Sequence, residues 1–166
     1  MTTADDRDGQ SGPGLVLGVG CERGTPPAEM IALVELSLRD AGLDAADILS
    51  IASLDTRAEE PAMIALADHF SVPFHVFDAA RLERETPRLA NPSPIVFSHT
   101  GCHGVAEAAA LAGAGAAGRL IVAKRKSAHA TVAIAESVQG FDATASEPDS
   151  AASRIDSARA VPELAL

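Results

Sequence analysis

The chain has 166 residues, of which 47% are hydrophobic, and it contains no Trp or Tyr, so the core of a single domain must be built mainly from aliphatic and alanine side chains. A formal net charge of −10 argues against nucleic acid and anionic membrane as partners, because both are polyanions that bind basic surfaces. No apolar run approaches the roughly 20 residues of a membrane span, and two widely separated cysteines favour a reducing, cytoplasmic location.

The first part of the chain predicts a leader, a strand and a helix. Residues 1–13 are polar and charged, with acids where a signal peptide has bases, and predict a disordered leader. The apolar run at residues 15–20 predicts a strand. Thr25 as the N-cap, Pro26 as the first helical residue and Gly42 as a left-handed stop predict the helix that follows.

Strands and helices alternate through most of the remaining chain. Strands are predicted at 47–54, 73–77, 94–99, 119–126 and 130–137, and helices at 59–70 and 104–115, with a short helix and a proline-broken loop between 78 and 91. This order predicts a three-layer α/β/α domain over residues 14–138, with a mostly parallel sheet of about five to six strands. The last two strands should pair antiparallel, because their linker is too short for a crossover. Residues 139–166 predict a mostly disordered tail.

The loop after the first predicted strand is a candidate ligand site. Ligands of open α/β sheets lie beyond the carboxyl ends of the strands, where the first amides of a helix can bind an anion. Arg23 adds a planar donor fork that matches a carboxylate or phosphate. Three interpretations stay open: a nucleotide phosphate, a nucleophilic Cys21, or an anion that is not a nucleotide. The glycine spacing is one residue longer than the dinucleotide fingerprint, and Glu22 would repel a pyrophosphate.

A second loop, at residues 98–104, has the same predicted strand–loop–helix layout and could frame one cleft with the first. His99 and His103 are four residues apart, but the glycines between and after them make the segment a loop, so no metal pair is predicted. Glu107 falls in the first turn of the next helix, where a carboxylate suits the helix dipole. The basic cluster at residues 124–126 could help to hold an anion.

Three sequence blocks resemble the CobE/CbiG C-terminal domain family of cobalamin biosynthesis. They are GVGCERGTPPAEM, LAGAG within GVAEAAALAGAG, and KRK followed by TVAIAES, and together they cover about residues 14–136. The resemblance implies a compact α/β/α domain that acts on corrin-ring intermediates. In the CbiG proteins this domain is the C-terminal part of a larger enzyme that opens a ring lactone of a cobalt-precorrin and releases acetaldehyde. This chain resembles the free-standing CobE type.

The resemblance implies ligand contacts at Gly20, Cys21, Arg23 and Gly24 in the first block, and at Gly104, Glu107 and Ala108 in the second. With the loop residues, the predicted ligand-binding set is Gly20, Cys21, Arg23, Gly24, Thr25, Ser98, Thr100, Gly101, Gly104, Glu107 and Lys124. The predicted ligand is a precorrin with carboxylate arms. No cofactor of the protein's own is predicted, and any cobalt would be carried by the corrinoid ligand. Two alternatives remain: a hydrolase of the cobalt-precorrin-5A lactone, and an interaction module for other enzymes of the cobalamin pathway, such as its methyltransferases. No catalytic residue is assigned.

Overall fold

The computed structural model describes residues 14–137, and the predicted leader (1–13) and tail (139–166) lie outside the described residues. The strands are β1 (Gly14–Cys21), β2 (Ile48–Leu54), β3 (Phe74–Phe77), β4 (Arg119–Lys126) and β5 (Ala130–Ser137). The α-helices are α2 (Pro27–Ala41), α3 (Pro61–Phe70), α4 (Ala79–Glu83), α5 (Pro94–Thr100) and α6 (Val105–Ala114). Single 3₁₀ turns occur at Ala45–Asp47, Asp55–Arg57 and Thr86–Arg88.

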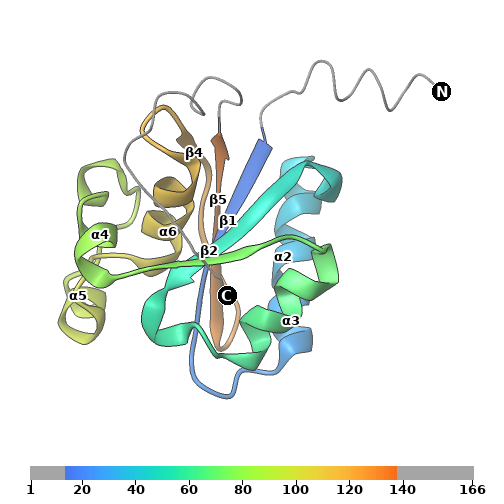
Figure 1. The fold of residues 1–166 in the computed structure, drawn as a ribbon, viewed down its shortest axis with the longest axis horizontal. Coiled ribbons are helices and arrows are strands. Elements are labelled where there is room, and N and C mark those ends of the chain that lie inside the picture. The colour runs from blue at the N-terminus through green and yellow to red at the C-terminus, as the bar shows by residue number, and fades with distance from the viewer. Residues whose placement is uncertain (1–13, 138–166) are drawn as a thin grey trace. The chain divides into compact units, whose positions relative to one another are not determined.

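The strands form one five-stranded sheet in the order β3-β2-β1-β5-β4. β1 pairs parallel with β2, and β2 pairs parallel with β3. β5 pairs antiparallel with both β1 and β4. Helices α2 and α3 cover one face of the sheet, and α4, α5 and α6 lie on the other (Figure 1). The predicted α/β class is confirmed, including the antiparallel closing pair.

One predicted strand is wrong: residues 94–99 belong to helix α5. Ser93 caps this helix by accepting the Val96 N–H at 3.2 Å, Pro94 occupies its first turn, and Gly101 ends it with φ 85°. A short apolar run does not distinguish a strand from a buried helical turn by periodicity, so these capping residues decide the local structure. The segment therefore adds no strand to the sheet.

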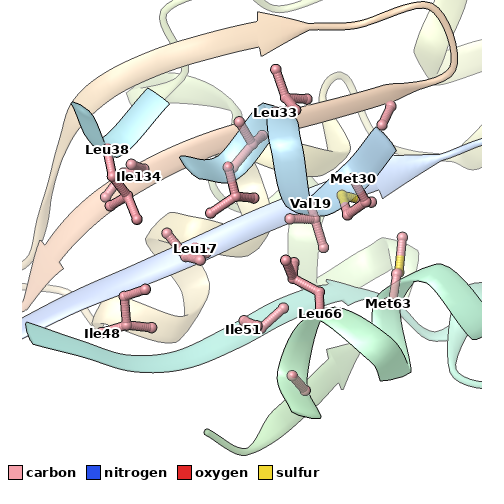
Figure 2. Packing of buried hydrophobic residues seen from close by; sticks show 14 of the residues in the cluster. Leu17, Val19, Met30, Leu33, Leu38, Ile48, Ile51, Met63, Leu66 and Ile134 are labelled. Atoms are coloured by element: carbon pink, nitrogen blue, oxygen red, sulfur yellow. The ribbon is translucent and has the colours of Figure 1, made fainter. Parts of the chain in front are cut away.

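The core on the α2–α3 face is aliphatic. Leu17 and Val19 of β1 point into it and meet Met30 of α2 and Leu66 of α3 (Figure 2). These side chains are almost completely buried. Full burial of such side chains contributes roughly 1.5–3 kcal/mol each, which is how a chain with 3% aromatic residues can still fold into a stable domain.

On the opposite face, α6 packs directly on the backbone of β1. A Cβ added to Gly18 would lie 1.9 Å from the carbonyl oxygen of Ala106 and 2.4 Å from the amide nitrogen of Ala110. The alanines of α6 are buried, and their small side chains allow this approach. Gly18 therefore serves helix–sheet packing. The close packing brings the N-terminus of α6 to the carboxyl end of β1, where Val105 lies next to Gly20.

No helix within residues 14–137 is long and apolar enough to cross a membrane.

Candidate functional site

A pocket of about 330 Å³ lies at the carboxyl end of β1. Gly20, Cys21 and Glu22 contribute to one side of it, and the start of α6 contributes Gly104, Val105 and Ala106. The β4–β5 hairpin supplies Lys124, Lys126, His129 and Thr131, and α5 supplies Val96. β1, α6 and the hairpin thus meet beyond the carboxyl end of β1, which is where open α/β sheets bind ligands.

Two lysines give this pocket its positive charge. Lys124 and Lys126 are two residues apart on β4, so they share a face of the strand, and both line the pocket. Arg125 between them pairs instead with Asp40 of α2, at 2.9 Å, on the other face. The first amides of α6, which have no partner within a helix, add a second source of positive potential. The pocket is therefore suited to an anion in an otherwise acidic protein.

Glu107 holds α6 to strand β4 and to the loop before α5. Its Oε1 accepts the backbone N–H groups of Ala90 (2.9 Å) and Asn91 (2.8 Å). Its Oε2 accepts the Asn91 side-chain amide and the backbone N–H of Lys124, both at 2.8 Å. The strand pairing shifts register between Val122 and Arg125, which places Lys124 in an irregular part of the β4–β5 ladder.

These hydrogen bonds change the role expected for Glu107. The side chain is 1% exposed, and burial alone would raise the pKa of this carboxyl. The hydrogen bonds from Lys124, Asn91 and Ala90 outweigh burial and lower the pKa below its ordinary value of 4.5. Both oxygens are used inside the protein, so Glu107 positions Lys124, whereas the sequence predicted a direct ligand contact.

The opening loop is bound to its own surroundings. The Gly24 N–H donates to Oε2 of the buried Glu60 at 2.9 Å. Thr25 is buried, and its hydroxyl donates to the carbonyl of Glu22 at 2.7 Å. Pro26, not the predicted Thr25, is the N-cap of α2. Arg23 is exposed and does not line the pocket, so only Gly20 and Cys21 of the predicted loop residues do.

Cys21 lacks the environment of a nucleophile. It packs against the hydrophobic cluster under α2 and α3. Burial is the main reason that the pKa of its thiol lies above the ordinary value of 9.0. Because the thiolate is the reactive form, a thiol kept protonated at neutral pH does not suit nucleophilic catalysis.

The second predicted loop lies mostly outside the pocket. The hydroxyl of Ser98 donates to the Ile95 carbonyl at 2.9 Å, and that of Thr100 donates to the Val96 carbonyl at 2.8 Å. Gly101 is the left-handed residue that ends α5. Because residues 94–100 are helical, these groups stay on α5, and the predicted pairing of the two loops across one cleft does not form. Gly104 is the predicted residue of this segment that lines the pocket.

A carboxylate–imidazole pair at the pocket was not predicted from the sequence. Glu29 of α2 reaches the β4–β5 turn, where it accepts the backbone N–H of His129 at 2.7 Å and contacts its ring Nδ1 at 2.9 Å. The Ser127 hydroxyl also donates to Glu29. The hydrogen bonds from Ser127 and His129 lower the pKa of Glu29 to about 2. The two residues are 100 positions apart in sequence, so no local pattern relates them.

Residues 14–137 contain no group of three or more His, Cys, Asp or Glu side chains arranged to hold a metal ion.

Comparison with known proteins relates the whole described unit to cobalamin biosynthesis. The family model described as cobalamin synthesis G C-terminus matches residues 15–135. Protein CobE from Sinorhizobium sp is 62% identical over 126 residues, which covers 76% of this chain and 82% of that protein. The crystal structure of CobE, a protein from the cobalamin (vitamin B12) biosynthetic pathway, matches with a TM-score of 0.71 and 37% identity, over 76% of this chain and 92% of that chain.

A larger enzyme shares the same segment. Cobalt-precorrin-5A hydrolase from Priestia megaterium is 28% identical over 121 residues. The match covers 73% of this chain but 32% of the enzyme, so the chain spans about a third of that relative's length.

Proposed function

From the premise that the chain belongs to the cobalamin synthesis G C-terminus family and is a cobalamin biosynthesis protein, we propose that it binds a corrin-ring intermediate in the pocket between β1, α6 and the β4–β5 hairpin. The carboxylate arms of the corrinoid bind Lys124, Lys126 and the first amides of α6. Val96 and Val105 offer apolar contacts to the edge of the ring. The observation that carries this proposal is the convergence of two lysines and a helix N-terminus on one pocket of a chain with net charge −10.

The size of the pocket limits how much of the ligand it encloses. A volume of about 330 Å³ is at the small end of ligand sites, which typically span roughly 300–1,000 Å³. The pocket therefore takes one edge of the macrocycle with its arms, while the rest of the ring stays outside. Binding of this kind relies on the charged arms, so neutralising them should remove most of the affinity.

The environment of Cys21 favours binding over lactone hydrolysis. The Cys21 thiol is turned toward the core and kept protonated, so it is not available as a nucleophile. Hydrolysis with acetaldehyde release and docking on other pathway enzymes are the two alternatives, and each has its own assay.

The test is an absorbance titration with dicyanocobyrinic acid, a corrinoid with free carboxylates, and with its heptamethyl ester. Wild-type protein should bind the acid far more tightly than the ester. Lys124→Ala and Lys126→Ala should each weaken binding by about two- to fivefold, the upper part of the range for a partly exposed charged contact. Arg39→Ala removes the same charge in the last turn of α2, away from the pocket, and should leave the affinity unchanged. Arg23→Ala should also have little effect.

Equal affinity for the acid and the ester, or an unchanged affinity in both lysine variants, contradicts the proposed site. An enzymatic assay for acetaldehyde with a purified lactone-containing precorrin separates binding from turnover. Catalytic release of acetaldehyde would favour the hydrolase. A stable complex with a pathway methyltransferase in the absence of corrinoid would favour the interaction module.

A further inference from the structure

A carboxylate–imidazole pair, Glu29 and His129, borders the proposed corrinoid pocket. His129 lines the pocket from the β4–β5 turn, and Glu29 approaches it from the first turn of α2. The Nδ1–Oε1 distance is 2.9 Å, and the backbone N–H of His129 also donates to Glu29. The ring is therefore held at one nitrogen, and Nε2 is the nitrogen that remains for a ligand.

We propose that His129, held at Nδ1 by Glu29, is a protonation-dependent contact of this pocket, donating from Nε2–H to a ligand carboxylate when its ring is charged. The inference rests on the proposed function, because it requires that the pocket receives a carboxylate. It adds a third cationic group to Lys124 and Lys126, and the charge of an imidazole is the one that ordinary changes of pH can switch.

The charges around the imidazole favour its protonated form. The hydrogen bond to Glu29 is the main reason that the pKa of His129 lies above the ordinary value of 6.5, and the Glu22 carboxylate in the loop after β1 acts in the same direction. Lys124 and Lys126 of β4 are the other charged groups that line the pocket, and they favour the neutral ring. Ser127, in the same turn, binds Glu29 through its hydroxyl and keeps that carboxylate next to the ring.

This arrangement predicts the direction of the pH effect. Below the pKa of His129 the ring is charged and can donate from Nε2 while Nδ1 stays on Glu29. As the pH rises through that pKa, the imidazolium is lost, and with it one charge-assisted contact to the ligand. Because the His129 side chain is 50% exposed, the affinity for a corrinoid carboxylate should fall by about two- to fivefold between pH 6.5 and 9.

The first experiment needs no ligand. An NMR titration of the histidine Cε1–H signals in the full chain should give His129 a pKa above 6.5, and Glu29→Gln should lower it. His69 and Glu35 form a matched pair at 2.9 Å that joins α3 and α2 and does not line the pocket. Glu35→Gln should therefore leave the His129 signal unchanged. A His129 pKa at or below 6.5 in the wild type overturns the inference.

The second experiment measures the affinity for dicyanocobyrinic acid at pH 6.5 and 9 in three proteins. Wild type and the control His69→Asn should both show the decrease of about two- to fivefold. His129→Asn keeps a donor for Glu29 but has no Nε2, so its affinity should be lower at pH 6.5 and nearly independent of pH. An equal decrease in His129→Asn and wild type overturns the role of His129 while leaving the proposed function intact.

A small carboxylate distinguishes failure of the inference from failure of the proposed function. If dicyanocobyrinic acid does not bind at any pH, the proposed corrinoid function fails. Glutarate, followed by NMR, then tests the anion contact alone. Glutarate-induced shifts of the His129 signal at pH 6.5 that become weaker at pH 9 support the inference, and their absence at pH 6.5 overturns it.

Discussion

Replacing Glu107 with glutamine tests whether one buried carboxylate organises the pocket. Glutamine has the same shape but one acceptor oxygen, whereas Glu107 accepts four hydrogen bonds. The Asn91 amide can rotate to present its oxygen, but the Lys124 N–H then faces an amide donor. An unsatisfied buried N–H costs about 1–3 kcal/mol, and bonds to a neutral acceptor are about 1 kcal/mol weaker than bonds to a charged one. Since burying the neutral amide is cheaper than burying a charge, the expected net destabilisation is about 2–4 kcal/mol.

Urea unfolding followed by circular dichroism measures this change as a free energy. Glu136→Gln is the control, because Glu136 pairs with an Arg119 side chain that is 74% exposed, and such pairs contribute about 0.5 kcal/mol. The pKa of Glu107 is lower in the folded state than in the unfolded state, where it is near 4.5. The Glu107 carboxylate therefore contributes fully to the free energy of unfolding above the unfolded-state pKa, and this contribution is lost as the pH falls through the folded-state pKa. The difference between Glu107→Gln and wild type should therefore shrink below about pH 4. A destabilisation under about 1 kcal/mol at pH 7 would show that the hydrogen bonds to Glu107 do not stabilise the fold in this way.

Two further predictions concern Gly18 and Cys21 of β1. Gly18→Ala should destabilise the domain by about 3 kcal/mol or more, because the new Cβ would lie 1.9 Å from the Ala106 carbonyl oxygen, which belongs to backbone and cannot move aside. Gly42→Ala, where the space is open but φ is 69°, should cost only about 1 kcal/mol, and similar urea midpoints for the two variants would contradict this account. Cys21→Ser should leave corrinoid affinity unchanged in the absorbance titration, since the thiol faces the core; loss of a demonstrated turnover in this variant would show that Cys21 is a nucleophile after all.

Local patterns in the sequence predicted most of the fold. The apolar runs and the proline and glycine signals around them located α2, α3, α6 and all five strands, and the short linker before β5 predicted its antiparallel pairing. The family resemblance is confirmed as well. The error at α5 has a local cause, because Ser93 and Pro94 are helix-start signals that an apolar reading of residues 94–99 overlooked.

The candidate site was less accessible to sequence reasoning, because its members are defined by partners on distant elements. Gly20, Cys21, Gly104 and Lys124 were predicted and line the pocket. Lys126 could have been added from the two-residue period of a strand, which puts it on the same face as Lys124. Glu107 forms hydrogen bonds with residues 16 and 17 positions away, and His129 pairs with Glu29. These contacts depend on how α2, α6 and β4 pack, so no local sequence spacing predicts them.

Strand β4 is at one end of the sheet, so one side of its backbone has no neighbouring strand within the described residues. An open strand edge can recruit a strand from another molecule, and charged side chains and local irregularity are what prevent this. β4 carries the charged side chains of Lys124 and Lys126, and its pairing with β5 shifts register between Val122 and Arg125.

The basic residues of β4 can therefore protect the open strand edge from pairing with another molecule, which is a function independent of any ligand. A chain that had lost corrinoid binding would still be under pressure to keep charge on this edge, because an alanine-rich β4 would favour self-association. Retention of these lysines among related proteins would not by itself be evidence of binding. For the same reason, light scattering of the lysine variants should precede any titration, since a protein that aggregates through β4 would lose affinity without losing a ligand contact.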